Sequence, residues 1–185
     1  MLATDDLRHR LLKEAMHLLD ADGVDAVTIR AVARRAGVSH GAPRRYFTTR
    51  AQLLATLAQA GLDDLDQRLN APDLPHEADA RLRGAAAAYL GFARERPALF
   101  ELITRHDLLE DSGLGLRHTS LAVLGRWREL VAAARPGSTD DDSLVLFTAV
   151  HGLAALHSRR ALDLLQRDPA HLLEHILARA HEPSR

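Results

Sequence analysis

The chain has 185 residues, enough for one domain of average size or for a small domain joined to a larger one. Apolar residues make up 46% and charged residues 26%, which excludes an intrinsically disordered chain. The absence of cysteine excludes disulfides and thiolate zinc sites and agrees with a reducing cytoplasm, while the net charge of −1 taken alone speaks against a nucleic-acid partner.

The hydropathy pattern predicts neither export nor membrane insertion. The chain begins MLATDD, which is acidic and lacks the apolar core of a signal peptide. The longest nearly apolar run, residues 144–156, is too short to cross a bilayer. We therefore expect a cytoplasmic protein without a membrane partner.

Apolar residues recur at helical spacing almost throughout, which predicts an all-α protein. The first helix is expected over residues 5–21, with an apolar stripe on one face. Asp22-Gly23 is typical of a helix end. Thr28 is typical of an N-cap and predicts a short second helix directly after it.

A turn and two further helices are expected after the second helix. Gly37 supplies the turn, and Ser39 is expected to cap a third helix over about residues 40–46. Thr49 and Gln52 have the spacing of a capping box and predict the start of a long fourth helix.

The clearest linker is the segment NAPDLP at residues 70–75. It predicts a small N-terminal domain over residues 1–50, a connecting helix to about residue 70, and a helical bundle domain over residues 76–185. Proline and glycine positions divide the bundle domain into helices near residues 77–95, 97–106, 112–134, 140–166 and 169–181.

Charge is distributed unevenly along the chain. Residues 1–60 carry nine basic and six acidic groups, a net of +3, whereas residues 61–185 carry fifteen and nineteen, a net of −4. The stretch 26–61 contains no acidic residue, and six arginines lie in it: Arg30, Arg34, Arg35, Arg44, Arg45 and Arg50. A basic segment on an acidic body predicts one localised anionic partner.

Residues 28–47 have the spacing of two short helices joined by a tight turn, which is the helix-turn-helix geometry. The second helix of such a motif can enter the major groove of DNA. Arginines there can bind guanine or phosphate. The residues expected to contact DNA are Thr28, Arg30, Ser39, His40, Gly41, Ala42, Arg44, Arg45, Tyr46 and Arg50. For Arg34 and Arg35, a solvated helix face without DNA contact remains the alternative interpretation.

The string TIRAVARRAGVSHGAPRRYFTTRAQLL resembles the signature of the TetR family of transcriptional regulators. Nine positions match it: Thr28, Ala33, Ala36, Gly37, Val38, Ser39, Gly41, Phe47 and Leu53. Arg44 stands where the family usually has Tyr, Tyr46 where it has His, and Pro43 falls within the expected third helix. We expect these departures to change the base preference.

The resemblance implies a three-helix DNA-binding domain followed by a regulatory and dimerisation domain. It also implies a repressor that binds a palindromic operator in double-stranded DNA as a homodimer and is released by a small-molecule inducer. The last two long helices are then expected to pair with their copies in a four-helix bundle. We expect no cofactor, and the absence of catalytic motifs predicts that the chain is not an enzyme.

Seven residues of the second domain are candidates for lining a pocket for an unknown apolar or amphipathic ligand. They are Tyr89, Phe92, Phe100, Ile103, Trp127, Phe147 and His151. Ordinary core packing is the alternative interpretation for each of them.

Two further alternatives remain open at this point. The chain could bind DNA and sense no small molecule, using its second domain for dimerisation or for a protein partner. It could instead be a helical metal-binding or di-metal enzyme, since His171 and His175 lie one turn apart beside Glu174. No third ligand is evident, and zinc usually takes at least three from a protein, so we predict no metal site.

Overall fold

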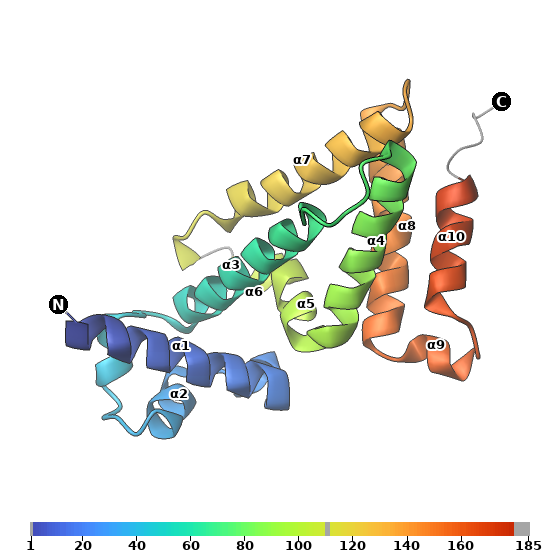
Figure 1. Cartoon of the computed structure of the whole chain (residues 1–185). Helices are drawn as coiled ribbons and strands as arrows, with labels where there is room; N and C mark the ends of the chain where they lie inside the picture. Colours follow the sequence, from blue (N-terminus) through green and yellow to red (C-terminus); the bar gives the residue numbers. More distant parts are fainter. Residues whose placement is uncertain (1, 110–111, 180–185) are drawn as a thin grey trace. The chain divides into compact units, whose positions relative to one another are not determined.

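The computed structural model describes residues 2–109 and 112–179, which form helices and turns without a β-strand (Figure 1). The predicted all-α class is confirmed. The chain packs as two compact units, Met1–Leu62 with Ala98–Thr119 and Asp63–Pro97 with Ser120–Arg185. Helices α3 (Arg50–Leu69) and α7 (Leu116–Ala134) contribute residues to both units.

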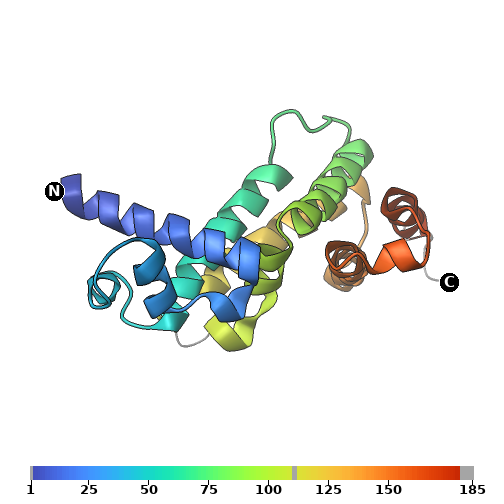
Figure 2. The ribbon, with the colours of Figure 1, turned by 90° about the horizontal axis from the view of Figure 1, so that it is seen from below.

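The first unit is built around its N-terminal helix. Its elements before α3 are α1 (Leu2–Asp22), the 3₁₀ helix η1 (Val24–Ala26), α2 (Ile29–Arg35) and the 3₁₀ helix η2 (Ala42–Arg45). Helix α1 packs against η1 and α2 (Figure 2). The buried side chains include Leu11, Ala15, Leu19, Val32, Phe47 and Leu53. The unit also holds most of α5 (Pro97–Thr104) and all of α6 (His106–Leu109).

The predicted end of α1 and start of α3 are confirmed with one shift, whereas α1 begins at Leu2, before its predicted start at residue 5. Helix α1 ends before Gly23, whose φ of +79° suits glycine and whose N–H donates to the Leu19 carbonyl at 3.0 Å. At the start of α3 the Gln52 N–H donates to Thr49 Oγ1 at 3.0 Å, as expected. The Gln52 side chain, however, accepts from the N–H of Thr48 at 2.8 Å, one residue before the predicted cap.

The third helix differs most from its prediction. Residues 42–45 form a single 3₁₀ turn, where an α-helix over 40–46 was expected. Pro43 has no N–H, so the α-helical bond from residue 43 back to residue 39 cannot form. The prediction that Ser39 caps this helix by its side chain is also wrong. The Ala42 N–H that it would bind donates instead to the Ser39 backbone carbonyl at 3.0 Å.

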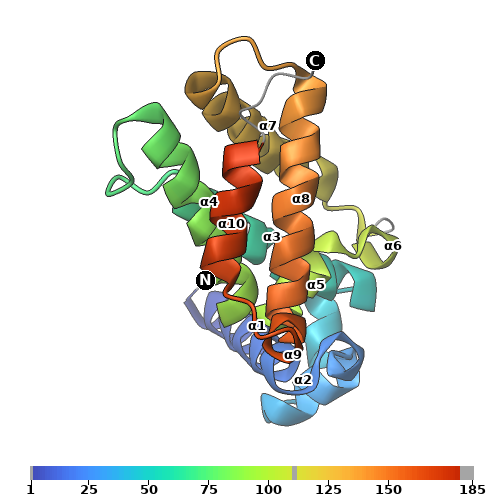
Figure 3. The same cartoon turned by 90° about the vertical axis from the view of Figure 1, so that its right-hand side faces the viewer.

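The second unit is a bundle of long helices. Its members are α4 (Ala78–Glu95), α8 (Asp140–Ser158), the short α9 (Ala161–Leu164) and α10 (Pro169–Arg179), with parts of α3 and α7. Helix α4 packs mainly against α8, and α10 packs against both (Figure 3). Residues 70–77 connect α3 to α4, so the predicted break in helix is present, but this segment lies within the second unit and not between the two units.

Two helices of the second half are shorter than predicted. The helix expected over 140–166 ends at Ser158, because Arg160 adopts a left-handed backbone conformation with φ of 58°, and α9 follows it. The helix expected from residue 112 begins at Leu116. The last helix is described to Arg179, and its predicted end at residue 181 lies outside the described residues.

Candidate nucleic-acid interface

The helix-turn-helix begins at a capped helix end. Thr28 is extended, with φ of −124°, and its Oγ1 accepts the N–H of Ala31 at 3.1 Å. The cap predicted from the sequence is confirmed. Helix α2 then buries Val32 and Ala33, so its opposite face remains free for contacts outside the chain.

The turn after α2 depends on Gly37. Its φ of +66° lies in the left-handed region, where a side chain would be strained. The N–H of Gly37 donates to the Arg34 carbonyl at 3.2 Å, and that of Val38 donates to the Ala33 carbonyl at 3.0 Å. These hydrogen bonds end α2, and the chain then continues to η2.

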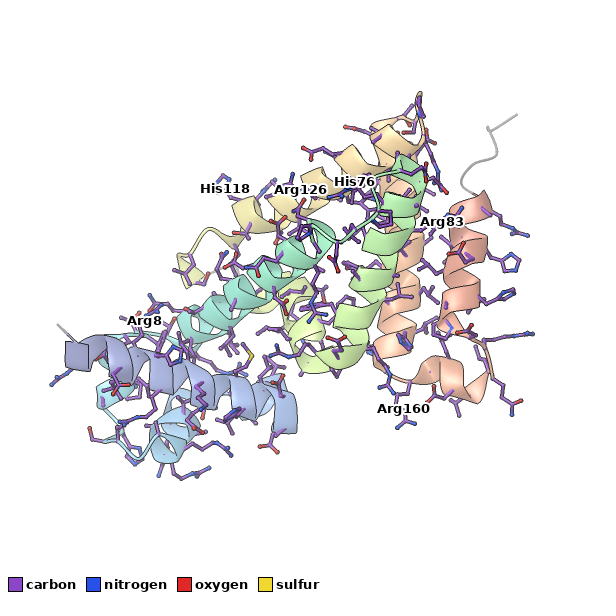
Figure 4. The ribbon with its side chains drawn as sticks, viewed as in Figure 1. Arg8, His76, Arg83, His118, Arg126 and Arg160 are labelled. Atoms are coloured by element: carbon purple, nitrogen blue, oxygen red, sulfur yellow. The ribbon has the colours of Figure 1, made fainter. Side chains whose placement is uncertain are left out.

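Element η2 presents two exposed arginines and is fixed to the rest of the unit by two buried residues. Pro43 is buried within the turn, and Phe47 directly after it is 1% exposed. The guanidinium of Arg8 on α1 lies 5.9 Å from the centre of the Phe47 ring (Figure 4). Arg44 and Arg45 lie between these two anchors and are both exposed. The anchoring role of Pro43 was not expected from the sequence, where proline indicated only a break.

A hollow lies between the start of α2 and η2. It has a volume of about 640 Å³ and is open to solvent. Five of its six lining residues belong to the set expected to contact DNA, namely Thr28, Arg30, His40, Gly41 and Arg44, and the sixth is Ile29. Ser39, Ala42, Arg45 and Tyr46 lie in the adjoining turns. The fold therefore brings together most of the predicted residues on one surface.

Arg50 has a structural role that the sequence did not indicate. Its Nε donates to the Val27 carbonyl at 2.7 Å and its Nη2 donates to the Val24 carbonyl at 2.6 Å. These bonds attach the start of α3 to the segment between α1 and α2. These bonds use two of the five guanidinium N–H donors, so Arg50 positions the start of α3 and keeps donors for a phosphate.

Arg34 and Arg35 are the two arginines of α2 for which simple exposure to solvent is the alternative to DNA contact, and Arg35 forms an ion pair within the chain. Arg35 Nε lies 3.1 Å from Glu14 Oε2 on α1, in an exposed ion pair. Such pairs add little stability but reduce the charge presented to a partner. Arg34 is exposed at the end of the same helix.

In the second unit, four of the candidate ligand residues form one cluster. The Tyr89 hydroxyl lies 2.8 Å from His151 Nδ1. The Phe147 ring stacks on His151 at 5.8 Å between centres and meets the Trp127 ring edge-on at 5.9 Å. Burial raises the pKa of the Tyr89 phenol and lowers the pKa of His151.

The other three candidate ligand residues lie on α4 and α5. Phe92 is buried on α4 beneath the guanidinium of Arg68, 5.4 Å from its ring centre. Phe100 and Ile103 lie on α5, within the first unit.

The lowered pKa of His151 predicts a loss of stability in mild acid. The unfolded chain takes up a proton on this histidine below about pH 6.5, whereas the folded chain resists it. The free energy of unfolding should therefore fall as the pH drops from about 6.5 toward the lowered pKa of folded His151. Urea unfolding midpoints between pH 7.5 and pH 5 measure this slope, which His151→Gln should flatten. The exposed His118→Gln serves as the control, and an unchanged slope in His151→Gln would contradict the assignment.

Two family models match the chain. The model of bacterial regulatory proteins of the tetR family matches residues 11–57. The model of the tetracyclin repressor-like C-terminal domain matches residues 82–180, which is more than half of the chain.

Solved structures share the whole fold. A protein with unknown function from Rhodococcus sp. RHA1 is 29% identical with a TM-score of 0.82, over 95% of this chain and 93% of that one. A TetR-family transcriptional regulator from Streptomyces coelicolor is 20% identical with a TM-score of 0.74, over 96% and 97% of the two chains. The second likeness concerns the fold alone.

Curated relatives match over a shorter length. The nucleoid occlusion factor SlmA of Photorhabdus laumondii subsp. laumondii is 30% identical over 105 residues, 55% of this chain and 52% of the relative. That of Escherichia coli O1:K1 / APEC is 33% identical over 97 residues, 51% and 48%. The chain thus spans about half the length of the curated relatives it matches.

No helix within residues 2–109 and 112–179 combines the length and the apolar character needed to cross a membrane. The two family models together cover the helix-turn-helix and most of the second half of the chain, in the order in which the structure has them. The chain therefore belongs to the TetR family of bacterial regulatory proteins.

Proposed function

We propose that the chain is a ligand-responsive repressor, which binds a palindromic operator as a homodimer and is released from it by a small molecule. The observation that carries the proposal is the exposure of Arg44 and Arg45 on a turn held by buried Pro43 and Phe47. Arginines presented on a fixed turn can enter a DNA groove without first being ordered, which lowers the entropic cost of binding.

The hollow beside η2 suits the DNA backbone and base edges. Arg30 and Arg44 bring positive charge to it, and His40 adds a hydrogen-bonding ring. Gly41 has no side chain to prevent close approach. We assign base contacts to Arg44 and Arg45, and phosphate contacts to Arg30 and to the exposed N–H groups around Thr28.

The proposed dimer interface lies on the outer face of α8 and α10. A groove of about 440 Å³ lies between these helices and is lined mainly by apolar side chains, among them Leu153, Leu156, Leu172 and Ile176. Leu156 is 47% exposed and Val145, also on α8, is 70% exposed. A second copy of both helices would cover this surface as a four-helix bundle and place two η2 turns on one duplex.

The ligand site is proposed at the cluster of Tyr89, Trp127, Phe147 and His151. A hydrogen-bonded polar pair among aromatic rings suits a small amphipathic molecule, whose polar group can replace one partner of the pair. Helix α3 contributes residues to both units and is the element through which a ligand would act on the DNA-binding surface. A coupling of about 1–3 kcal/mol is enough for a useful switch.

Selection of bound duplexes from a random DNA pool tests the proposal. We expect enrichment of an inverted repeat whose half-sites lie about one helical turn, roughly 34 Å, apart. The enriched duplex then serves as the probe for small molecules that release the protein. Enrichment of a single asymmetric half-site would contradict the dimer, and no enrichment at all would contradict sequence-specific repression.

A further inference from the structure

Helix α10 carries two histidines whose ring nitrogens converge. His171 and His175 are one helical turn apart, and their Nε2 atoms lie 3.0 Å from each other. The rings are nearly perpendicular, at 88°, with centres 4.5 Å apart. Both side chains are exposed, so a solute can reach them.

The separation of the two nitrogens matches what a chelated cation requires. Bonds of about 2.0–2.1 Å from zinc to imidazole nitrogen place two ligands about 3.3 Å apart at a tetrahedral angle and about 2.9 Å apart at a right angle. The observed 3.0 Å lies between these values. The two side chains therefore need almost no rearrangement to hold one ion.

Without a cation, one proton joins the pair. The Nε2–H of one ring donates to the Nε2 lone pair of the other. A cation takes the place of this proton when both rings carry their hydrogen on Nδ1, a change of tautomer that leaves both imidazoles neutral. Neutral imidazole is the form that binds zinc, nickel and copper.

Neighbouring carboxylates are already engaged. Glu174 forms an ion pair with Arg83 on α4, and Arg83 Nε also lies 2.7 Å from Asp79 (Figure 4). Within the part of the chain that the structure describes, no group of three or more metal-binding side chains occurs. Water must therefore complete the coordination of an ion held by the two histidines.

We propose that His171 and His175 chelate one borderline divalent cation per chain, of the class of Zn²⁺, Ni²⁺ or Cu²⁺, with water in the remaining positions. His175 also lines the groove between α8 and α10, so the ion binds at the edge of this groove. The site lies outside the DNA-binding surface and the aromatic cluster, and it borders the proposed dimer interface, because His175 lines that groove.

Zinc titration of the full chain, freed of metal by a chelator, tests the site by calorimetry. The chain has no cysteine, so no thiolate site competes. We expect one Zn²⁺ per chain, and roughly tenfold or greater weakening in His171→Ala or His175→Ala, since either leaves a single nitrogen ligand. The matched control is the double variant His76→Ala/His118→Ala, which removes two exposed histidines elsewhere and should bind zinc as the unaltered chain does (Figure 4).

Paramagnetic resonance of bound Cu²⁺ gives a second readout. We expect splitting from two equivalent imidazole nitrogens, reduced to one in either single variant. No zinc binding, or equal weakening in the control, would overturn the assignment, and one ion per two chains would overturn completion by water. Because zinc binding is measured without DNA, its failure is distinguishable from a failure of the proposed repressor function.

Discussion

Replacing Arg44 and Arg45 together by glutamine should abolish recognition of the selected operator. Each arginine that reads a base contributes about 1–3 kcal/mol, so the double variant should bind the operator no better than unrelated DNA. Both side chains are exposed and neither supports the core, which lies under Pro43 and Phe47. The variant should therefore fold normally, and fluorescence anisotropy with labelled operator measures its loss of affinity.

The salt dependence of binding separates the possible roles of these arginines. If they bind bases, the double variant loses specificity while the slope of log affinity against log salt changes little. If they bind phosphates, the slope falls by about two, one for each charge removed, and unrelated DNA is affected as strongly as the operator. We expect the first result, because both arginines lie on η2 and Arg44 lines the hollow beside it.

The chain offers a matched control for this variant. Arg159 and Arg160 are also adjacent and exposed, but they follow α8 in the second unit. Replacing both by glutamine removes the same charge outside the helix-turn-helix and should leave operator affinity within about threefold of the unaltered chain. An equal loss in both double variants would mean that net charge, not the position of η2, determines binding.

Replacing Trp127 by alanine is expected to be the most destabilising single change in the second unit. The side chain is 1% exposed, its Nε1 donates to the Ser143 carbonyl at 3.0 Å, and its ring meets Phe147. Truncation of a buried tryptophan costs about 3–5 kcal/mol, because the cavity is only partly refilled. The hydrogen bond joins α7 to α8, so its loss weakens the contact between these two helices.

Urea unfolding followed by circular dichroism measures this cost in the variants, which lack the only tryptophan of the chain. Trp127→Phe keeps an aromatic ring and loses the hydrogen bond, and should fall between the unaltered chain and Trp127→Ala. Leu164→Ala is the control, since this side chain is 88% exposed and its truncation should cost less than about 0.5 kcal/mol. A cost below about 1 kcal/mol for Trp127→Ala would contradict a core position.

Local signals in the sequence predicted helix ends correctly where the hydrogen bonds that form those ends join residues close in sequence. Thr28 caps α2 through a bond to a residue three positions away, and Gly23 ends α1 through a bond to a residue four positions away. Signals of this range are visible in the residues themselves. The family signature around Gly37 likewise predicted the location of the helix-turn-helix, and the model of bacterial regulatory proteins of the tetR family matches there.

The length of η2 depends on a residue that is visible in the sequence. Helical spacing predicts an α-helix over residues 40–46, but Pro43 lacks the N–H that such a helix needs, which leaves only the tighter turn over Ala42–Arg45. The end of α8 at Ser158 is a different case, because no glycine or proline indicates the left-handed conformation of Arg160.

By itself, the sequence determined the helical class, the non-helical segment at residues 70–75 and the arginines of the helix-turn-helix, because periodicity, caps and charge runs are properties of neighbouring residues. Only the tertiary structure decided that Arg50 binds the carbonyls of Val24 and Val27, and that Trp127 is buried against α8. These contacts join residues 16 to 26 positions apart. They exist because packed helices bring distant groups within bonding distance, and no local pattern encodes which groups will meet.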